Sequence, residues 1–260
     1  MRLPFGLRRF TSAAIRPLRV QIKHGPNQGC RWSLAAAGRH RAGAFEPERM
    51  AVIEAMLSPG DCFWELGAHH GYVTLIASRA VGQHGRVYAF EPSSYNFPFL
   101  EKHVRWNRLS NTIPLNLAVS DQDGIGDFGG GGSSQTFHLG GGTETVRVAS
   151  IGGLLSEGLK SPDMLKIDVE GAEGAVLSAG AMFLGPTSRL IVSLHSMENY
   201  RQVTATLRDR GLLILESAGV RELVKRGEWT DDDPDIAAVG PRHGELLRRL
   251  AMLEYFAGRA

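Results

Sequence analysis

Short apolar runs alternate with stretches of helical periodicity from about residue 46 to the end of the chain. The helical stretches include a closing one whose apolar stripe is Leu246, Leu250, Leu253 and Ala257. Strands alternating with helices indicate an α/β fold, with a doubly wound and mostly parallel sheet covered on both faces. The predicted strands are 62–66, 86–91, 113–119, 164–168, 190–195, 212–216 and 236–239. The other predicted helices are 50–57, 72–81, 95–106, 172–184 and 198–210.

Glycine dominates residues 121–143 and interrupts this alternation, because nine glycines lie between residues 124 and 142. Glycine loses the most conformational freedom on folding and buries no side chain, so we predict a flexible loop here. The G-x-G-x-x-G at Gly124, Gly126 and Gly129 is not followed by a helical pattern, which argues against a dinucleotide site. The loop is interpreted as a tolerated insertion or as a lid over a substrate.

Charge is distributed unevenly along the chain, although the net charge is only +2. Residues 1–45 carry nine basic side chains and no acid, whereas residues 46–260 carry 20 basic and 27 acidic side chains. This divides the chain into a basic N-terminal arm with a lead-in segment, 1–45, and a main domain, 46–260. An Arg-rich start with Thr11 and Ser12 is typical of a mitochondrial transit peptide, and also of a solvated or docking arm.

The composition excludes several classes of protein. No window approaches 18 consecutive apolar residues, so no transmembrane segment is expected. Cys30 and Cys62 are the only cysteines, which excludes a disulfide scaffold and a four-cysteine zinc site. Few cysteines favour a reducing compartment, so we expect a cytoplasmic protein, with a mitochondrial location as the alternative. A basic arm on an acidic body argues against a nucleic-acid binder.

The strongest chemical signal is the turn after the first predicted strand, where Glu65 is followed by Gly67 and Gly71. Glycines there let the backbone turn tightly and approach a ligand, and the next helix offers free N–H groups. The turn lacks the G-x-G-x-x-G of a nicotinamide site. The Glu65 carboxylate suits a ligand with a positive end, such as a sulfonium nucleoside with an amino-acid tail.

Two further signals follow the second and fourth predicted strands. Glu91 closes the second strand 26 residues after Glu65, where a carboxylate accepts hydrogen bonds from a ribose diol, and Pro92 fixes the chain beyond it. Three carboxylates and a lysine surround the end of the fourth strand, within Lys166–Glu173. Carboxylates in this position either cap the following helix or lie beside a reacting centre.

Three motifs in this order, Glu65–Tyr72, Val87–Pro92 and Leu165–Glu173, resemble the FkbM-type S-adenosylmethionine-dependent methyltransferases. The resemblance covers most of the chain, 50–240. It implies the Rossmann-like class I methyltransferase fold, with a seven-stranded sheet in which one strand is antiparallel. It also implies S-adenosyl-L-methionine as cofactor and O-methylation of a hydroxyl on a small molecule or sugar.

The resemblance also implies a cofactor site, position by position. The methionine tail would contact Glu65, Gly67, Ala68 and Gly71, and the ribose would contact Glu91 and Pro92. The adenine would contact Ala118, Val119 and Ser120, and the methyl donor would lie beside Asp168. This sequence departs from the family pattern at two positions. His69 stands where the family turn usually has asparagine, and Ser193 stands where relatives often have glutamate before Leu194-His195.

Methyl transfer to a hydroxyl needs positioning of the two reactants and removal of a proton. His195, at the end of the fifth predicted strand, is the first candidate base, and Asp168 or Glu170 is the alternate. His69 and His70 come next as candidates. The spacing of these histidines and Asp168 is not a metal-ligand signature, so no metal is expected.

Three alternatives to a small-molecule or glycan acceptor remain open. The chain could methylate a protein or a nucleic acid, with the basic arm as a docking element. It could be a cofactor-binding scaffold that has lost catalysis, which the Ser193 departure keeps open. A nucleotide-dependent oxidoreductase is disfavoured by the glycine pattern.

Overall fold

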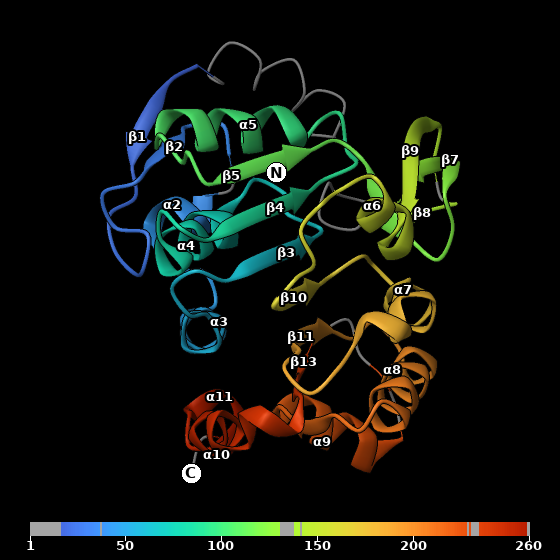
Figure 1. Cartoon of the computed structure of the whole chain (residues 1–260). Coiled ribbons are helices and arrows are strands. Elements are labelled where there is room, and N and C mark those ends of the chain that lie inside the picture. Colours follow the sequence, from blue (N-terminus) through green and yellow to red (C-terminus); the bar gives the residue numbers. More distant parts are fainter. Residues whose placement is uncertain are drawn as a thin grey trace.

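The computed structural model describes residues 17–36, 38–130, 138–140, 142–227, 229 and 234–258. Its centre is a seven-stranded sheet in the order β12–β13–β11–β10–β3–β4–β5 (Figure 1). β13 is antiparallel to β11 and β12, and the other pairings in this sheet are parallel. The predicted sheet, doubly wound with one antiparallel strand, is therefore confirmed. In spatial order the strands are Leu213–Glu216, Asp235–Val239, Arg189–Ser193, Met164–Ile167, Cys62–Leu66, Arg86–Phe90 and Thr112–Leu115.

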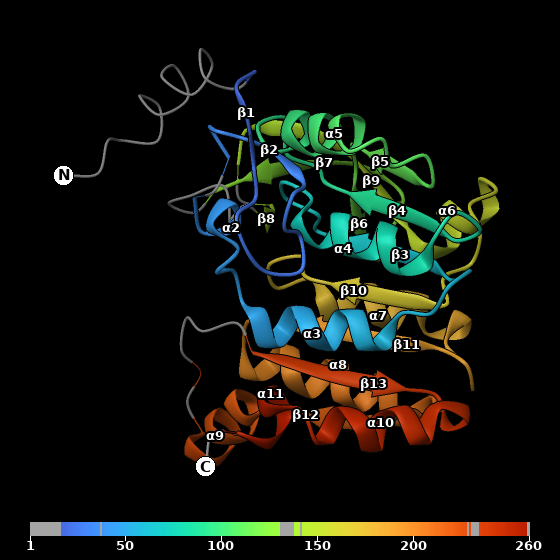
Figure 2. The same cartoon turned by 90° about the vertical axis from the view of Figure 1, so that its left-hand side faces the viewer.

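Helices cover both faces of this sheet (Figures 1 and 2). The period-two alternation of β3 explains why, because its apolar side chains point to both sides. Trp64 packs into one core with Leu177 of α7, and Phe63 packs into the other with Ile76 of α4. None of the helices in the described residues is long and apolar enough to cross a membrane. The helices are α2 Gly38–Ala42, α3 Pro47–Met56, α4 Tyr72–Val81, α5 Phe97–Trp106, α6 Ile151–Ser156, α7 Glu173–Gly180, α8 Met197–Asp209, α9 Ala218–Arg226, α10 Gly244–Ala251 and α11 Glu254–Ala257.

The strand predicted at 113–119 is wrong as a single element. It is two strands, β5 and β6 (Ala118–Ser120), and only β5 belongs to the main sheet. Asn116 lies between them and turns the chain, because its side-chain amide donates to the carbonyls of Glu91 at 2.8 Å and Pro92 at 2.9 Å. β6 then joins a second sheet, in the order β6–β9–β7–β8.

The prediction of a flexible glycine-rich loop is also wrong for part of its range. Gly124–Gly129 form β7, which pairs antiparallel with β8 (His138–Leu139) and with β9 (Glu144–Ser150). Backbone pairing does not require side chains, and Phe128 supplies the burial that the glycines lack, against Ala118 and Val146. Residues 131–137 and 141 lie outside the described part of the chain.

The lead-in segment before residue 46 forms ordered structure that sequence periodicity missed. β1 (Arg19–Gln21) and β2 (Arg31–Ser33) form an antiparallel hairpin, and α2 follows. The Trp32 ring is fully buried and stacks on His103 of α5 with a centroid distance of 3.8 Å. The described part of this segment thus packs against the main domain through Ile22, Trp32 and Ala36, whereas the predicted transit-like arm, with Thr11 and Ser12, lies outside the described residues.

The closing apolar stripe is interrupted, because the chain forms two helices, α10 and α11. Leu246, Leu250 and Leu253 pack as predicted, but Ala257 is exposed. The break between the helices shifts the helical phase, so Phe256 enters the core in its place.

We expect Trp32→Ala to lower the free energy of unfolding by about 3–5 kcal/mol, because it removes a buried ring from a packed stack. Leu18→Ala is the control in the same segment, since Leu18 is 51% exposed, and we expect a change within about 0.5 kcal/mol. Urea unfolding followed by circular dichroism measures both. An unchanged midpoint in Trp32→Ala would show that the hairpin adds nothing to the domain.

Candidate active site

A cavity of about 420 Å³ opens at the carboxyl ends of the central strands. In doubly wound sheets this edge is where ligands bind. Most of the residues predicted from the sequence line it: Glu65, Gly67, Ala68, Glu91, Pro92, Ala118, Val119, Asp168 and Glu170. Gly71, Ser120 and His195 do not line it. Gly71 shapes the turn, the Ser120 hydroxyl donates to Asp121 Oδ1 at 3.0 Å, and His195 lies behind Asp168 and Glu170.

The glycine turn after β3 requires glycine for steric reasons. Gly67 has φ +82°, and a Cβ there would lie 1.9 Å from the carbonyl oxygen of Asp168. The amides of Gly67 and Ala68 both donate to the Phe90 carbonyl, at 3.0 and 2.9 Å. The turn is therefore fixed against the ends of two neighbouring strands, and its backbone stands open to a ligand in the cavity.

Glu91 is held as a hydrogen-bond acceptor at the end of β4. Its Oε2 accepts the amide N–H of His69 at 2.6 Å, and its Oε1 accepts the amide of Ser93 at 3.0 Å and Nδ2 of Asn96 at 3.3 Å. Burial raises the pKa of this carboxyl to about 7, against the opposing effect of those hydrogen bonds. Glu91 keeps acceptor capacity toward the cavity that it lines.

The contact from His69 explains one of the two departures from the family pattern. His69 meets Glu91 through its backbone, which adopts φ +49°, so the side chain at this position is not part of the contact. The His69 ring stacks on His70 with a centroid distance of 3.8 Å, within a buried group of aromatic and imidazole rings. Burial lowers the pKa of His69 to about 4 and that of His70 well below its usual value.

Glu65 is buried beside the glycine turn. Its Oε2 accepts the hydroxyl of Thr74 at 2.5 Å, and burial raises the pKa of its carboxyl to about 7. A cationic ligand group placed near Glu65 would favour its ionised form, which is the interaction expected for a positive amino-acid tail.

One part of the cavity wall is an apolar slot. Leu117, Ala118 and Val119 line it together with Phe128 of β7 and Leu139 of β8. The second sheet thus contributes part of the wall that the sequence interpretation assigned to adenine. Such a slot suits a flat aromatic ring, because it offers dispersion contacts and few competing polar groups.

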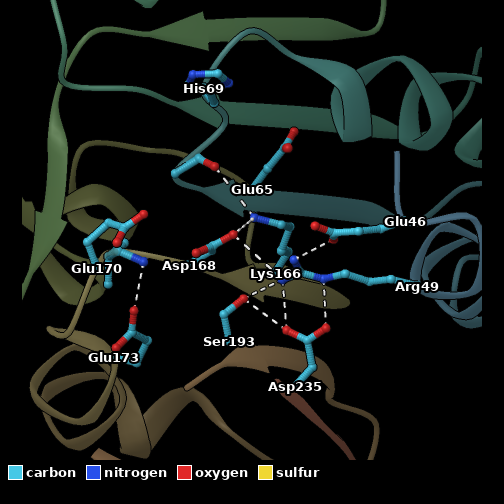
Figure 3. Close-up of polar contacts among 12 residues, drawn as sticks. Glu46, Arg49, Glu65, His69, Lys166, Asp168, Glu170, Glu173, Ser193 and Asp235 are labelled. Atoms are coloured by element: carbon cyan, nitrogen blue, oxygen red, sulfur yellow. Dashed lines mark hydrogen bonds and ion pairs between the residues drawn. The ribbon is translucent and has the colours of Figure 1, made fainter. Parts of the chain in front are cut away.

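Asp168 is the most strongly stabilised anion of the site. Its Oδ2 lies 2.9 Å from Lys166 Nζ and 3.6 Å from Nη2 of Arg49 (Figure 3). Burial opposes its ionisation, but the charges of Lys166 and Arg49 outweigh burial and hold the pKa of Asp168 far below its usual value. These two cations therefore favour the ionised form of Asp168.

His195 is the centre of a group of three carboxylates. Its Nδ1 lies 3.0 Å from Glu173 Oε1, and its Nε2 lies 3.5 Å from Glu170 Oε2 and 3.8 Å from Asp168 Oδ1. Burial opposes its protonation, but the hydrogen bond and charge of Glu173, with the other two charges, raise the pKa of His195 to about 9. The imidazole is therefore protonated at neutral pH.

Asp168 and Glu170 are not caps of the following helix. α7 begins at Glu173 after Ala172, which makes no side-chain capping bond. It is the buried Glu173 that accepts the loop amides, from Val169 at 2.8 Å and from Gly171 at 3.1 and 3.2 Å. The helix-cap interpretation of the two earlier carboxylates is therefore wrong, and both remain available to the cavity.

Asp168, Glu170 and His195 each present one possible metal-ligand atom, and these atoms lie within 4.8 Å of one another. The group could hold a divalent cation only after His195 loses its proton, because a metal binds the neutral imidazole. His69 and His70 belong instead to the ring stack, so the four-residue set weighed from the sequence is not the one that the structure assembles.

Sequence reasoning missed two charged residues that organise this region, Arg49 and Asp235. Arg49 lies on α3 and Asp235 begins β13, 186 positions apart. Neither occurs in a motif, and a helical arginine or an aspartate within an acidic run is ordinarily a surface residue. Only the folded sheet brings them together, so no spacing signal could have identified the pair.

The strand order, with β13 antiparallel to its neighbours, is that of the class I methyltransferase fold. Residues 65–213 match the family described as Methyltransferase FkbM domain, which is more than half of the chain, so the chain belongs to the FkbM methyltransferase family. It is an S-adenosylmethionine-dependent methyltransferase. Among curated proteins, none matches this sequence.

Three solved structures illustrate the similarity of fold. FkbM methyltransferase from Methylobacillus flagellatus KT is 15% identical, with 78% of this chain and 55% of that chain covered and a TM-score of 0.49. Precorrin-6y C5,15-methyltransferase from Geobacter metallireducens GS-15 is 15% identical, with 75% and 87% covered and a TM-score of 0.49. Aeropyrum pernix fibrillarin, solved with natively bound S-adenosyl-L-methionine, is 19% identical, with 70% and 66% covered and a TM-score of 0.46.

We expect Glu173→Gln to lower the pKa of His195 from about 9 toward its usual value of about 6.5, because the strongest anionic partner is lost. In the wild type, the stability contributed by this imidazole is complete below about pH 6.5 and is lost as pH rises through about 9. A histidine-selective NMR titration measures the pKa, with His195→Gln identifying the resonance. An unchanged pKa of His195 in Glu173→Gln would contradict the conclusion that Glu173 is the main cause of the raised pKa.

Proposed function

We propose that this enzyme transfers the methyl group of S-adenosylmethionine to a hydroxyl oxygen of a small molecule or sugar. The observation that carries the proposal is the group of side chains around His195. Two of its carboxylates, Asp168 and Glu170, line the cavity in which we place the donor, and the His195 imidazole lies beside them. Methylation of a hydroxyl releases a proton, and Glu170 together with His195, once the imidazole has lost its own proton, could take it up.

The donor would lie across the cavity from the apolar slot to the glycine turn. Glu91 would accept the ribose hydroxyls, Leu117 to Val119 would contact the adenine, and Glu65 would attract the amino-acid tail. This places the sulfonium toward Asp168, whose fixed negative charge would attract it. Methyl transfer is then an in-line displacement, and holding both reactants at the right distance supplies much of the catalysis.

The pKa values divide the roles among the candidate bases. Asp168 binds protons too weakly to act as a base, so its role would be electrostatic. His195 must first lose its own proton, and its raised pKa would make it effective as pH approaches 9. Glu170 lines the cavity 3.5 Å from His195, so it would relay the proton from acceptor to imidazole.

A compact acceptor suits the space that is left. Donor and acceptor would share one cavity of about 420 Å³, to whose wall the lead-in segment contributes the rings of His40 and Phe45. These rings offer apolar contact around a hydroxyl group, as small-molecule sites commonly do.

Glu91→Ala is expected to weaken S-adenosylmethionine binding by about tenfold or more, because the ribose would lose charge-assisted hydrogen bonds. Calorimetric titration of the purified chain measures the dissociation constants. Glu101→Ala is the matched control, since Glu101 is exposed on α5, and it should bind as the wild type does. Equal affinity in Glu91→Ala and the wild type would refute the ribose contact.

Labelled methyl transfer from S-adenosylmethionine to a panel of sugars and small hydroxyl compounds tests the acceptor class. We expect an ether product that survives mild alkali, and a rate that increases from pH 7 toward pH 9 as His195 loses its proton. An alkali-labile ester, or transfer only to protein or nucleic acid, would contradict the proposal. A chain that binds the donor yet methylates nothing would support the scaffold alternative instead.

A further inference from the structure

A buried line of polar contacts runs from α3 to β13 beneath the cavity (Figure 3). The guanidinium of Arg49 binds both carboxylate oxygens of Asp235, from Nε at 2.7 Å and from Nη2 at 2.7 Å. Nη2 also donates to the hydroxyl of Ser193, which in turn donates to Asp235 Oδ1 at 2.9 Å. Asp235 accepts a further bond from the Tyr255 hydroxyl and is fully buried.

The antiparallel direction of β13 is what places Asp235 here. Because β13 runs against β11, its first residue lies beside the last residue of β11, and Asp235 and Ser193 are cross-strand partners. The small Ser193 side chain leaves room for the neighbouring carboxylate. At this position of the sheet's carboxyl edge, the carboxylate therefore comes from β13 instead of from β11.

Arg49 connects this buried pair to the candidate active site. Its Nη2 lies 3.6 Å from Asp168 Oδ2, the same oxygen that Lys166 Nζ contacts at 2.9 Å. Two cations thus hold one oxygen of Asp168, and the other oxygen, Oδ1, faces His195. Both Arg49 and Asp235 lie outside residues 65–213, the stretch that matches the family.

The contact with Asp168, more than burial, distinguishes this ion pair from one with a structural role alone. Burying an arginine and an aspartate costs desolvation energy that an apolar pair would avoid. The same chain offers a comparison at the opposite edge of the sheet, where Arg189 Nη2 binds Asp61 Oδ1 at 2.7 Å. That pair is also mostly buried, but neither residue lines the cavity or contacts Asp168.

We infer that Arg49 is a positioning residue of the methyl-donor site, anchored by Asp235, and that it fixes the Asp168 carboxylate toward the donor. The inference rests on the proposed function, because it takes Asp168 to face the sulfonium end of S-adenosylmethionine. Asp235 and Ser193 act only through Arg49. Asp235 supplies from β13 the charged anchor that the end of β11 lacks.

The decisive variant removes both charges of the pair, Arg49→Met with Asp235→Asn. Arg49→Met alone leaves Asp235 buried without a cation, so it should unfold at lower urea concentration than the wild type, whereas the double variant should recover stability. We expect the double variant to bind S-adenosylmethionine about 10-fold to 100-fold more weakly than the wild type, because Asp168 then keeps Lys166 alone of its two cationic partners and its orientation is less fixed. Calorimetric titration measures the affinity beside the urea unfolding curve.

Arg189→Met with Asp61→Asn is the matched control, because it deletes an equally close ion pair away from the cavity. It should change stability and leave the dissociation constant of S-adenosylmethionine unchanged. If the double variant of Arg49 and Asp235 fails to fold, donor binding by a single variant, Arg49→Lys, provides a second test. Arg49→Lys keeps the charge but lacks the guanidinium fork that reaches Asp235 and Asp168 together, so it should also bind about tenfold more weakly.

Rescue tests the anchor itself. Asp235→Ser should weaken donor binding, and adding Ser193→Glu should restore most of it, because a carboxylate at the cross-strand partner can again meet Arg49. Wild-type affinity in Arg49→Lys, or in a folded double variant, would overturn the inference and leave Arg49 a structural residue. If the wild type itself does not bind S-adenosylmethionine, the proposed donor site fails instead, so the two failures are distinguishable.

Discussion

A carboxylate that stays ionised inside a protein needs cations close to it, and Asp168 has two. Lys166 comes from its own strand, β10, and Arg49 reaches it from α3. Through Arg49 this anion contacts α3, and its charge adds to that of Glu173 in raising the pKa of His195. The main chain of Asp168 also packs closely against the glycine turn, because its carbonyl oxygen lies where a Cβ on residue 67 would be.

The other carboxylates of the cavity are poised differently. Glu65 and Glu91 have pKa values raised to about 7 by burial, so they lie near the midpoint between their two protonation states at neutral pH. A ligand that brings a positive charge and a pair of hydroxyl donors would shift both toward the ionised form. The site thus combines one permanent anion with two that a suitable donor molecule would recruit, which is consistent with selective binding of a sulfonium nucleoside.

Much of the fold was readable from local sequence. The ends of β3 and α4 are those predicted, because a compact apolar run and a clear helical period are bounded there by glycines. Most of the residues predicted to bind the cofactor line the cavity, since Glu65, Gly67 and Glu91 lie at the carboxyl ends of strands. Local patterns failed where a long-range contact decides the outcome. β7 forms from glycine-rich sequence because β9 pairs with it, and the strands of the β1–β2 hairpin, three residues each, are too short to show a period. The departure at Ser193 became interpretable only when β13 was seen to bring Asp235 beside it.

A crystal structure of the chain with S-adenosylhomocysteine tests the central claim most directly, because it shows where the donor lies. The account predicts the ribose hydroxyls within hydrogen-bond distance of Glu91 and the adenine between Val119 and Phe128. It also predicts the sulfur on the side of Asp168, with the Arg49 contact intact. A ligand bound elsewhere, or one whose sulfur points away from Asp168, would contradict the assignment of this cavity as the methyl-donor site.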